Sequence, residues 1–375
     1  MHTHLLTPHA PLVLRIGKPF GETGGGESFT FPLPSTVAGA LRTAHADALG
    51  MDFQSSSDIE QIIAWNCHGA LPAEISKDGI AALFPRPTDV RYGSTSPVSL
   101  QTLAPLELGE GEGCDLPDSL LPVFLQDDDK SKPADGPNWW TQKAMLEWLT
   151  GSTPNLEELG PVPLPVDTRT HVALDPLTLA AHEGQLFQSA GPDFEAQRIK
   201  PHREISGRGW LARRHALLAR FSETLAPSLL RLGGEGRLAN VSPCDAWPEI
   251  SDGLKSALEA GRRIRLILAT PALFDGGWKP GWINSDWKGS PPQCPGLVLR
   301  LRAVAVERWQ PISGWDMKER KPKAIRRLAP AGSVYWFEII EAPSDWIDAL
   351  WLSPISDTEQ DRRDGFGLAV PGVWN

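Results

Sequence analysis

Glycine and proline interrupt this chain frequently, with 35 of each among its 375 residues. Proline fixes its own φ angle and lacks a backbone N–H, and glycine raises the entropic cost of ordering a helix. Long uninterrupted helices are therefore expected to be few. The sequence predicts short elements that are separated by many turns and irregular loops.

One helix is predicted in a segment that begins at a proline and ends at a glycine. It opens at Pro34 and Ser35, with Ser35 as the expected N-cap, and it ends at Gly50. Shorter helices are predicted at residues 58–65, 139–149, 214–225 and 344–350. Alternating or apolar segments predict strands at residues 12–16, 228–232, 238–241, 263–269, 297–309, 333–340 and 368–374.

The two halves of the chain have the same predicted ending, which is a short helix, a glycine-rich turn and a short strand. Together with the strands before that helix, each half fits a βαββαβ pattern. The predicted fold class is therefore α+β, with two ferredoxin-like (RRM-like) domains that carry long insertions. Their expected bounds are 1–247 and 248–375. Such domains place a sheet face and loops within reach of single-stranded RNA.

The net charge of −10 argues at first against a nucleic-acid partner, but the charge is unevenly distributed. Residues 107–135 hold nine acidic residues and two lysines, and residues 105–137 are predicted to form an exposed acidic insertion. In contrast, residues 198–237 and 300–327 each hold nine Lys or Arg against three acidic residues. Each basic segment could be a solvated face, but the presence of two favours an anionic partner.

Four segments are candidate binding sites. The N-terminus of a helix at 34–42 would attract phosphate, with Arg42 as an added donor. The loop GGEGR at 233–237 could expose backbone N–H groups to an anion, and Arg237 would supply a guanidinium fork. The basic residues Arg198, Lys200, Arg203 and Arg208 form a third group, and Lys318, Lys321, Lys323, Arg326 and Arg327 form a fourth.

These segments also have ordinary structural interpretations. The helix could simply be capped and tightly packed, and the glycine loop could be a hairpin turn. The second basic segment could be a solvated loop, although Trp309 and Trp315 could stack on bases there. A second glycine loop, GFG at 365–367, follows Arg362 and Arg363 and occupies the matching place in the second half.

Catalysis has weaker support. The histidines have no informative spacing, and no Walker loop, GxSxG or HExxH motif is present. The four cysteines form no CxxC pair, so the sequence predicts no zinc site, no other metal and no cofactor. We expect a cytoplasmic protein, because no apolar run approaches the roughly 20 residues of a membrane helix and no signal peptide is recognised.

Several segments together resemble the third subunit of type III-B CRISPR (Cmr) effector complexes, a member of the RAMP superfamily. They are FPLPSTVAGALRT, LGGEGR, ATPALFDGGWKP, ISGWDMKERKPKAIRRLAPAGSVYWFE and GFGLAVPGVW, and they extend over nearly the whole chain. The resemblance implies a subunit that is not the nuclease. It also implies that the chain holds the 5′ tag of the CRISPR RNA and contacts the large polymerase-like subunit and the adjacent backbone RAMP subunit.

The same resemblance implies particular site residues. Ser35, Thr36 and Arg42 match the helix N-terminal segment. Gly233, Gly234, Gly236 and Arg237 match the first RAMP glycine loop, and Gly365 and Gly367 match the second. A hairpin that is predicted at 169–189, with its tip near Asp175, would be the thumb that presses on the RNA, with Arg169 as a contact.

Two other hypotheses stay open. Paired ferredoxin-like domains also occur in endoribonucleases that process CRISPR transcripts, and His202 lies among the basic residues Arg198, Lys200, Arg203 and Arg208. A purely protein-bridging scaffold would agree with the net acidity and the 15 tryptophans.

Overall fold

The computed structural model describes residues 1–14, 31–94, 98–117, 119–126, 131–160, 166–194, 197–198, 212–316 and 318–374. It is a mixed α/β structure of mostly antiparallel sheets with few helices, in agreement with the expected scarcity of long helices. The helices are α1 (Pro34–Leu49), α2 (Ser56–Ala64), α3 (Gln142–Leu149), α4 (Asp252–Ala260), α5 (Trp346–Leu350) and α6 (Glu359–Arg363), with a 3₁₀ turn at Leu156–Glu158.

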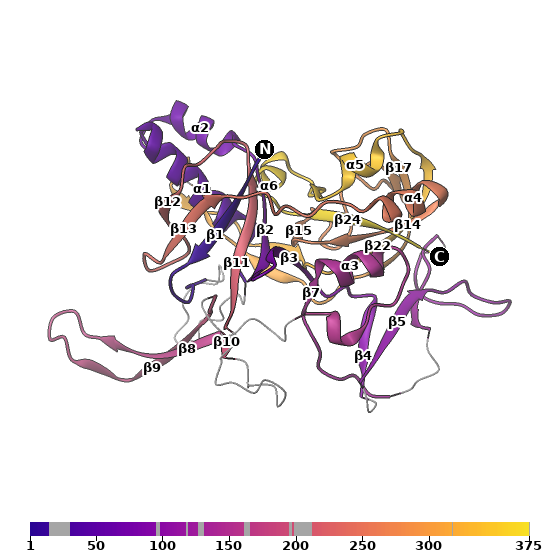
Figure 1. Cartoon of the computed structure of the whole chain (residues 1–375), viewed down its shortest axis with the longest axis horizontal. Helices are drawn as coiled ribbons and strands as arrows, with labels where there is room; N and C mark the ends of the chain where they lie inside the picture. The colour runs from indigo at the N-terminus through magenta and orange to yellow at the C-terminus, as the bar shows by residue number, and fades with distance from the viewer. Residues whose placement is uncertain are drawn as a thin grey trace.

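The first large sheet belongs to the first half of the chain (Figure 1). Its strands lie in the order β12 (Ser228–Arg231), β13 (Leu238–Pro243), β1 (His2–Pro8), β11 (Ala212–Phe221), β2 (Cys67–Ser76), β3 (Gly79–Pro85) and β7 (Trp139–Thr141), and β10 (Gln197–Arg198) pairs with β11. All of these pairs are antiparallel.

The second large sheet is built from the second half. Its order is β16 (Lys288–Gly289), β17 (Val298–Ala305), β22 (Val334–Glu341), β14 (Arg263–Leu268), β24 (Leu368–Val373) and β23 (Ser353–Pro354). The strands predicted in this half are confirmed to within a few residues, except that β17 ends four residues before the expected Trp309.

The four central strands of both sheets share one order. Numbered along the chain within each half, they lie fourth, first, third and second: β13-β1-β11-β2 and β24-β14-β22-β17. The split βαβ pattern has this order. Its helices are present only in part. In the first half, helices α1 and α2 connect β1 to β2, whereas no helix connects β14 to β17 in the second half. In the second half, α5 and α6 lie between β22 and β24, whereas no helix lies between β11 and β13 in the first half.

Two elements in the first half differ from the prediction. Residues 214–221 of the helix predicted at 214–225 belong to strand β11, and residues 222–225 follow it outside any helix. The segment is a strand because β11 is paired on both sides and most of its described side chains are buried. A strand that is buried on both faces carries a continuous apolar run that imitates a helix. The first strand lies at His2–Pro8. Residues 12–14 of the strand predicted at 12–16 are outside any strand although Leu12 and Leu14 are buried, and residues 15–16 lie outside the described part of the chain.

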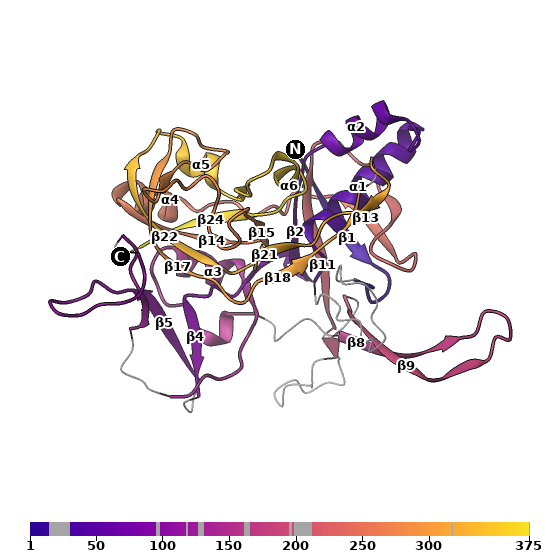
Figure 2. The ribbon, with the colours of Figure 1, turned by 180° about the vertical axis from the view of Figure 1, so that it is seen from behind.

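Smaller sheets surround these two. They are β4 (Val90–Gly93), β5 (Ser99–Pro105) and β6 (Val123–Leu125); β15 (Ala272–Leu273), β21 (Arg326–Ala329) and β18 (Gln310–Ile312); β19 (Trp315–Asp316) and β20 (Lys321–Pro322); and the hairpin β8 (Val166–Leu174) and β9 (Ala181–Pro192). The predicted hairpin is thus confirmed, and it projects away from the rest of the molecule in both views (Figures 1 and 2).

The acidic insertion is more ordered than expected. Strand β6 pairs with β5, Leu120 is buried, and the N–H of Leu121 donates to the carbonyl oxygen of Arg302 at 2.6 Å. Glu107 also lies 3.8 Å from Arg302. The segment 121–125 is therefore attached to the second sheet, whereas residues 106–117 are exposed.

The largest core cluster contains side chains of both halves. Phe84 and Trp140 from the first half join Ile264 and Tyr335 from the second. Asp89, fully buried after β3, accepts hydrogen bonds from Arg265 of β14 at 2.5 Å and from the indole of Trp148 at 3.1 Å. The two sheets therefore share one interior. No helix of the described residues is long and apolar enough to cross a membrane.

Candidate functional site

A groove of about 1000 Å³ lies between the outer face of α1 and the edge of the first sheet. One wall is helical and includes Ser35, Thr36 and Thr43. The opposite wall includes Arg231 at the end of β12, followed by Gly233 and Gly234. Two segments that are about 200 residues apart in sequence are thus brought together, and both had been singled out as binding candidates.

The N-terminus of α1 opens into this groove, but Ser35 is not its cap. Leu33 is the N-cap, in an extended conformation, and Pro34 occupies the first turn. The residue before a proline is restricted to extended backbone, so Leu33 cannot join the helix. Within the described part of the chain no side chain forms a capping hydrogen bond at this end, and no acidic residue lies in the first turn. Its positive dipole end is therefore not neutralised within the helix.

The glycine loop is held in place by the segment before residue 15. Gly234 donates its N–H to the carbonyl oxygen of Val13 at 2.8 Å, and a Cβ on Gly233 would lie 2.9 Å from the same oxygen. Gly233 also has a φ of +79°, which favours glycine. The N–H of Arg237 donates to the carbonyl oxygen of Gly234 at 3.3 Å, so two N–H groups of the expected anion nest are already used. Gly236 has a φ of +64° and open space around it, so only its backbone conformation requires glycine.

Two arginines flank the loop. Arg231 is exposed, lines the groove and forms no ion pair with any described residue. Arg237 is 22% exposed, and its Nη2 lies 3.7 Å from Glu235. Within the described part of the chain its buried Nε has no hydrogen-bond partner. Arg231 stands two residues before the glycine loop, which already associated it with this candidate in the sequence, and the structure places it on the groove.

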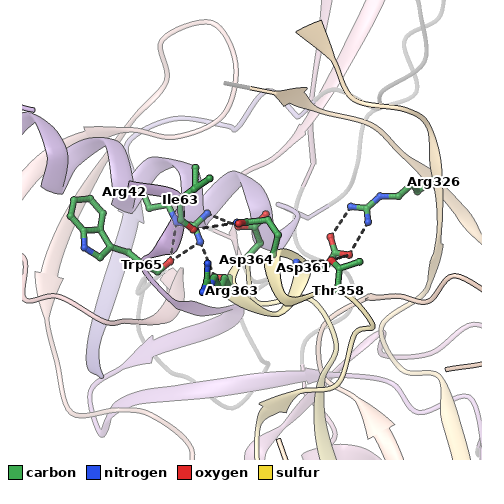
Figure 3. Close-up of polar contacts among 9 residues, drawn as sticks. Arg42, Ile63, Trp65, Arg326, Thr358, Asp361, Arg363 and Asp364 are labelled. Atoms are coloured by element: carbon green, nitrogen blue, oxygen red, sulfur yellow. Dashed lines mark hydrogen bonds and ion pairs between the residues drawn. The ribbon is translucent and has the colours of Figure 1, made fainter. Parts of the chain in front are cut away.

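Arg42 lies in the interior rather than on the groove (Figure 3). Its guanidinium forms an ion pair with Asp364 and donates to the carbonyl oxygens of Trp65, at 2.7 and 3.0 Å, and Arg363, at 3.0 Å. These contacts use its donors to fasten α1 to α6, which belong to different halves of the chain. Arg42 is therefore unavailable as a surface phosphate ligand.

The second glycine loop is also buried. Gly365 has a φ of +88°, and a Cβ there would lie 2.7 Å from the carbonyl oxygen of Gly69 in β2. A Cβ on Gly367 would lie 2.8 Å from Ser356 Oγ, and Phe366 is 2% exposed. Gly365 and Gly367 therefore do not form a second RNA-facing loop. They allow the segment after α6 to approach the first sheet closely.

The basic segment at 318–327 has several partners within the molecule. Lys318 donates to Glu60 of α2 at 2.7 Å, and this contact lowers the pKa of Glu60. Arg326 binds Asp361 of α6 through two bonds of 2.7 Å (Figure 3). Lys321 lies 3.5 Å from Glu319. Lys323 is exposed, and no described side chain forms an ion pair with it. Arg327 stacks on Trp309.

The structure describes only some of the other predicted site residues. Lys200, Arg203, Arg208 and His202 lie outside the described residues, and Arg198 is described only through the backbone of β10. Arg169 is on the projecting hairpin, 2.6 Å from Asp167, and its side chain is about half exposed. Among the described residues no three His, Cys, Asp or Glu side chains are grouped as a metal site.

Comparison with known families gives a match over almost the full length. The family described as CRISPR-associated protein (Cas_Cmr3) matches residues 4–374. The chain belongs to the Cas_Cmr3 family. This membership confirms the resemblance that the sequence segments indicated. In this Cas_Cmr3 protein Ser35 and Thr36 line a groove, whereas the glycine loop at 365–367 is buried. No curated protein matches the sequence.

Solved structures give more distant similarities. Two come from cryo-EM structures of the Type III-B Cmr-beta bound to cognate target RNA. One has 14% identity, covers 92% of this chain and 88% of the other, and has a TM-score of 0.48. The other, which also contains AMPPnP, has 15% identity, coverages of 89% and 86%, and a TM-score of 0.47. The Csm3-Csm4 subcomplex of the type III-A CRISPR-Cas interference complex gives 12% identity, full coverage of both chains and a TM-score of 0.40.

Proposed function

We propose that this Cas_Cmr3 protein is a non-catalytic RNA-binding subunit of a type III-B CRISPR effector complex. In this proposal it holds the 5′ tag of the CRISPR RNA and contacts the large polymerase-like subunit and the adjacent backbone RAMP subunit. Its two sheets are the cores of two ferredoxin-like domains. The observation that carries the proposal is the groove, where the uncapped N-terminus of α1 faces a glycine loop and Arg231.

The chemistry of the groove suits a phosphate backbone. The helix N-terminus presents a positive dipole end, and Arg231 has no acidic partner among the described residues. Arg237, next to the groove, has only a long contact with Glu235. A guanidinium can form two parallel hydrogen bonds with one phosphate. Ser35 and Thr36 add hydroxyl groups at the same end of the groove.

Further RNA contacts are assigned to exposed basic residues. Lys321, Lys323 and Arg327 are exposed, and Arg169 lies on the projecting hairpin, which we propose acts as a thumb. Arg198, Lys200, Arg203 and Arg208 remain proposed contacts from the sequence. Arg42, Gly365 and Gly367 are left out because they are buried, and Lys318 and Arg326 because their carboxylate partners compete with phosphate.

The test is the salt dependence of RNA binding by the assembled complex. Loss of one phosphate contact reduces the slope of log K against log salt by about 0.7 for single-stranded RNA. We expect Arg231→Ala and Arg237→Ala each to weaken binding of tag-containing RNA and to reduce this slope. Arg263→Ala is the matched control, because Arg263 is exposed and stacks on Trp374 away from the groove. Unchanged affinity and slope in both groove variants would contradict the proposal.

The non-catalytic assignment has its own test. The purified protein is incubated with CRISPR repeat RNA in the presence of a chelator. We expect intact RNA. Cleavage at a single site that is abolished by His202→Ala would instead identify a processing endoribonuclease.

A further inference from the structure

A second cavity, of about 520 Å³, lies in the other half of the molecule. Its walls come from four parts of the chain: five residues of the acidic insertion, residues 276–278 and 287, the end of β17 with the residues after it, and β21. The residues of the insertion are Leu116, Pro117, Leu120, Leu121 and Val123. None of the predicted site residues lines it except Arg327. Its volume is within the range of roughly 300–1000 Å³ that is typical of small-ligand pockets.

Two tryptophans present large exposed surfaces at this cavity. Trp278 is 42% exposed and Trp309 is 46% exposed, more than the other tryptophans whose side chains the structure describes. Trp278 is held rigidly, because its ring stacks on Trp287 at 6.3 Å and 16°. Its carbonyl oxygen also accepts a hydrogen bond from Tyr335 at 2.7 Å. A fixed, exposed ring loses little entropy when a flat ligand stacks on it.

The charge beside these rings is positive. Arg327 lies over one face of Trp309, 4.9 Å from the ring centroid, and Arg308 is exposed. Neither arginine forms an ion pair with any described residue. Glu307, the one acidic residue among the described residues that line the cavity, is paired with Arg86 at 2.7 Å. The cavity therefore combines an apolar floor, exposed indole rings and two arginines without carboxylate partners.

We propose that this cavity binds a nucleotide. Its base stacks on the exposed indole surface of Trp309 or Trp278, and its phosphate is bound by Arg308 and Arg327. Stacking on aromatic side chains together with arginine contacts is the way proteins bind unpaired bases. A peptide could fill the apolar floor, but flat rings beside unpaired guanidinium groups favour a base with a phosphate. The ligand is either an unpaired nucleotide of an RNA or a free mononucleotide.

The site is separate from the groove and shares only Arg327 with the proposed RNA contacts. Variants at Trp309 and Arg308 therefore test it independently of the proposed function. The full-length protein is titrated by calorimetry with 5′-AMP, adenosine, inorganic phosphate and an adenine hexaribonucleotide. We expect AMP to bind more tightly than adenosine or phosphate. Trp309→Ala should weaken AMP binding by at least about tenfold, whereas Trp309→Phe should keep most of it. Arg308→Ala should weaken AMP binding but not adenosine binding.

Two controls isolate the cavity. Arg263→Ala removes another exposed arginine that stacks on a tryptophan, at 4.9 Å from the Trp374 ring, and should leave AMP binding unchanged. Arg231→Ala, in the groove, should also leave it unchanged. Circular dichroism of each variant verifies folding. If the hexanucleotide binds more tightly than AMP and Trp309→Ala weakens the binding of both, the natural ligand is an RNA nucleotide. If Trp309→Ala weakens only the binding of AMP, the natural ligand is a free nucleotide.

Two results would overturn the inference. One is that Trp309→Ala weakens the binding of neither AMP nor the hexanucleotide, or that neither ligand binds at all. The other is that a photoreactive amino acid at position 308 crosslinks only to protein in the assembled complex, which would make the cavity a peptide-docking site.

Discussion

At the scale of single residues, Arg42 and Lys318 show how environment decides the value of an ion pair. Both join segments that are far apart in sequence, Arg42 to Asp364 and Lys318 to Glu60. Arg42 and Asp364 are each 6% exposed, whereas the Lys318 and Glu60 side chains are more than half exposed. A buried charge that loses its partner cannot regain its hydration, while an exposed one can.

We therefore expect Arg42→Ala to lower the free energy of unfolding by about 3–5 kcal/mol, because Asp364 would be left buried and unpaired. Lys318→Ala should leave the urea midpoint unchanged within error. Urea unfolding monitored by tryptophan fluorescence measures both. Similar effects of the two substitutions would show that the Arg42 network contributes no more than a surface contact.

His68 connects stability to pH. It lies on β2 opposite Arg220 of β11. Burial, together with the positive charges of Arg220 and the N-terminus, lowers the pKa of His68 to about 4. In the unfolded chain the imidazole binds its proton with the ordinary histidine pKa of 6.5. Below that pH the unfolded state takes up the proton first, so stability is complete above pH 6.5 and falls as the pH approaches 4.

We expect His68→Gln to reduce the loss of stability between pH 6.5 and pH 4 by roughly 2 kcal/mol. His9→Gln, at an exposed position, is the control and should leave the pH profile as it is. Thermal unfolding at several pH values provides the measurement. The role of His68 would be disproved by parallel profiles of His68→Gln and the unaltered protein.

At the scale of elements, the hairpin β8–β9 is the part that depends least on the rest of the fold. Leu177 and Leu179 at its tip are 92% and 73% exposed, and Leu186 is 73% exposed. Its base is attached to the body where the N–H of Leu12 donates to the carbonyl oxygen of Pro192 at 3.1 Å. A two-stranded hairpin has little stability of its own. The exposed leucines of the hairpin are therefore better explained by contact with a binding partner than by packing on the core of this protein.

We expect replacement of residues 173–185 by Asn-Gly to change the melting temperature by no more than about 2 °C, because the removed side chains are outside the core. If the proposed thumb role is right, the shortened protein still assembles but the complex binds tag-containing RNA less tightly. Differential scanning fluorimetry and an RNA-binding titration test the two parts. A large fall in melting temperature would mean that the tip packs on the body.

At the scale of the whole molecule, the two halves share a core instead of meeting at a wet interface. Two buried ion pairs connect the halves, one between Asp89 and Arg265 and the other between Arg42 and Asp364. Close packing reinforces these contacts, since Gly372 of β24 lies against Leu149 of α3. Domains with so large a common apolar interior are expected to unfold together.

Scanning calorimetry should accordingly give one transition for the full chain, and circular dichroism and fluorescence should follow the same curve. Asp89→Ala should move the entire transition to lower temperature, because it leaves Arg265 buried and without its carboxylate. Two resolved transitions, with only one shifted by Asp89→Ala, would instead indicate halves that fold independently.

The sequence by itself determined the short elements, the hairpin, most strands of the second half and the family. These depend on local periodicity, turn residues and motifs that can be seen along the chain. It also identified Ser35, Thr36 and the glycine loop, because a helix start and a glycine-rich turn have local signatures.

Only the tertiary structure decided which of these candidates lie at a surface. Strand β11 has helix-like composition and becomes a strand because β1 and β2 pair with it on both sides. Arg42 and the loop at 365–367 have the appearance of binding motifs, yet both are buried where α1, α6 and β2 meet. Arg231, in turn, gains its place on the groove from α1, which lies far away in sequence. Burial and pairing are properties of distant contacts, and no local pattern encodes them.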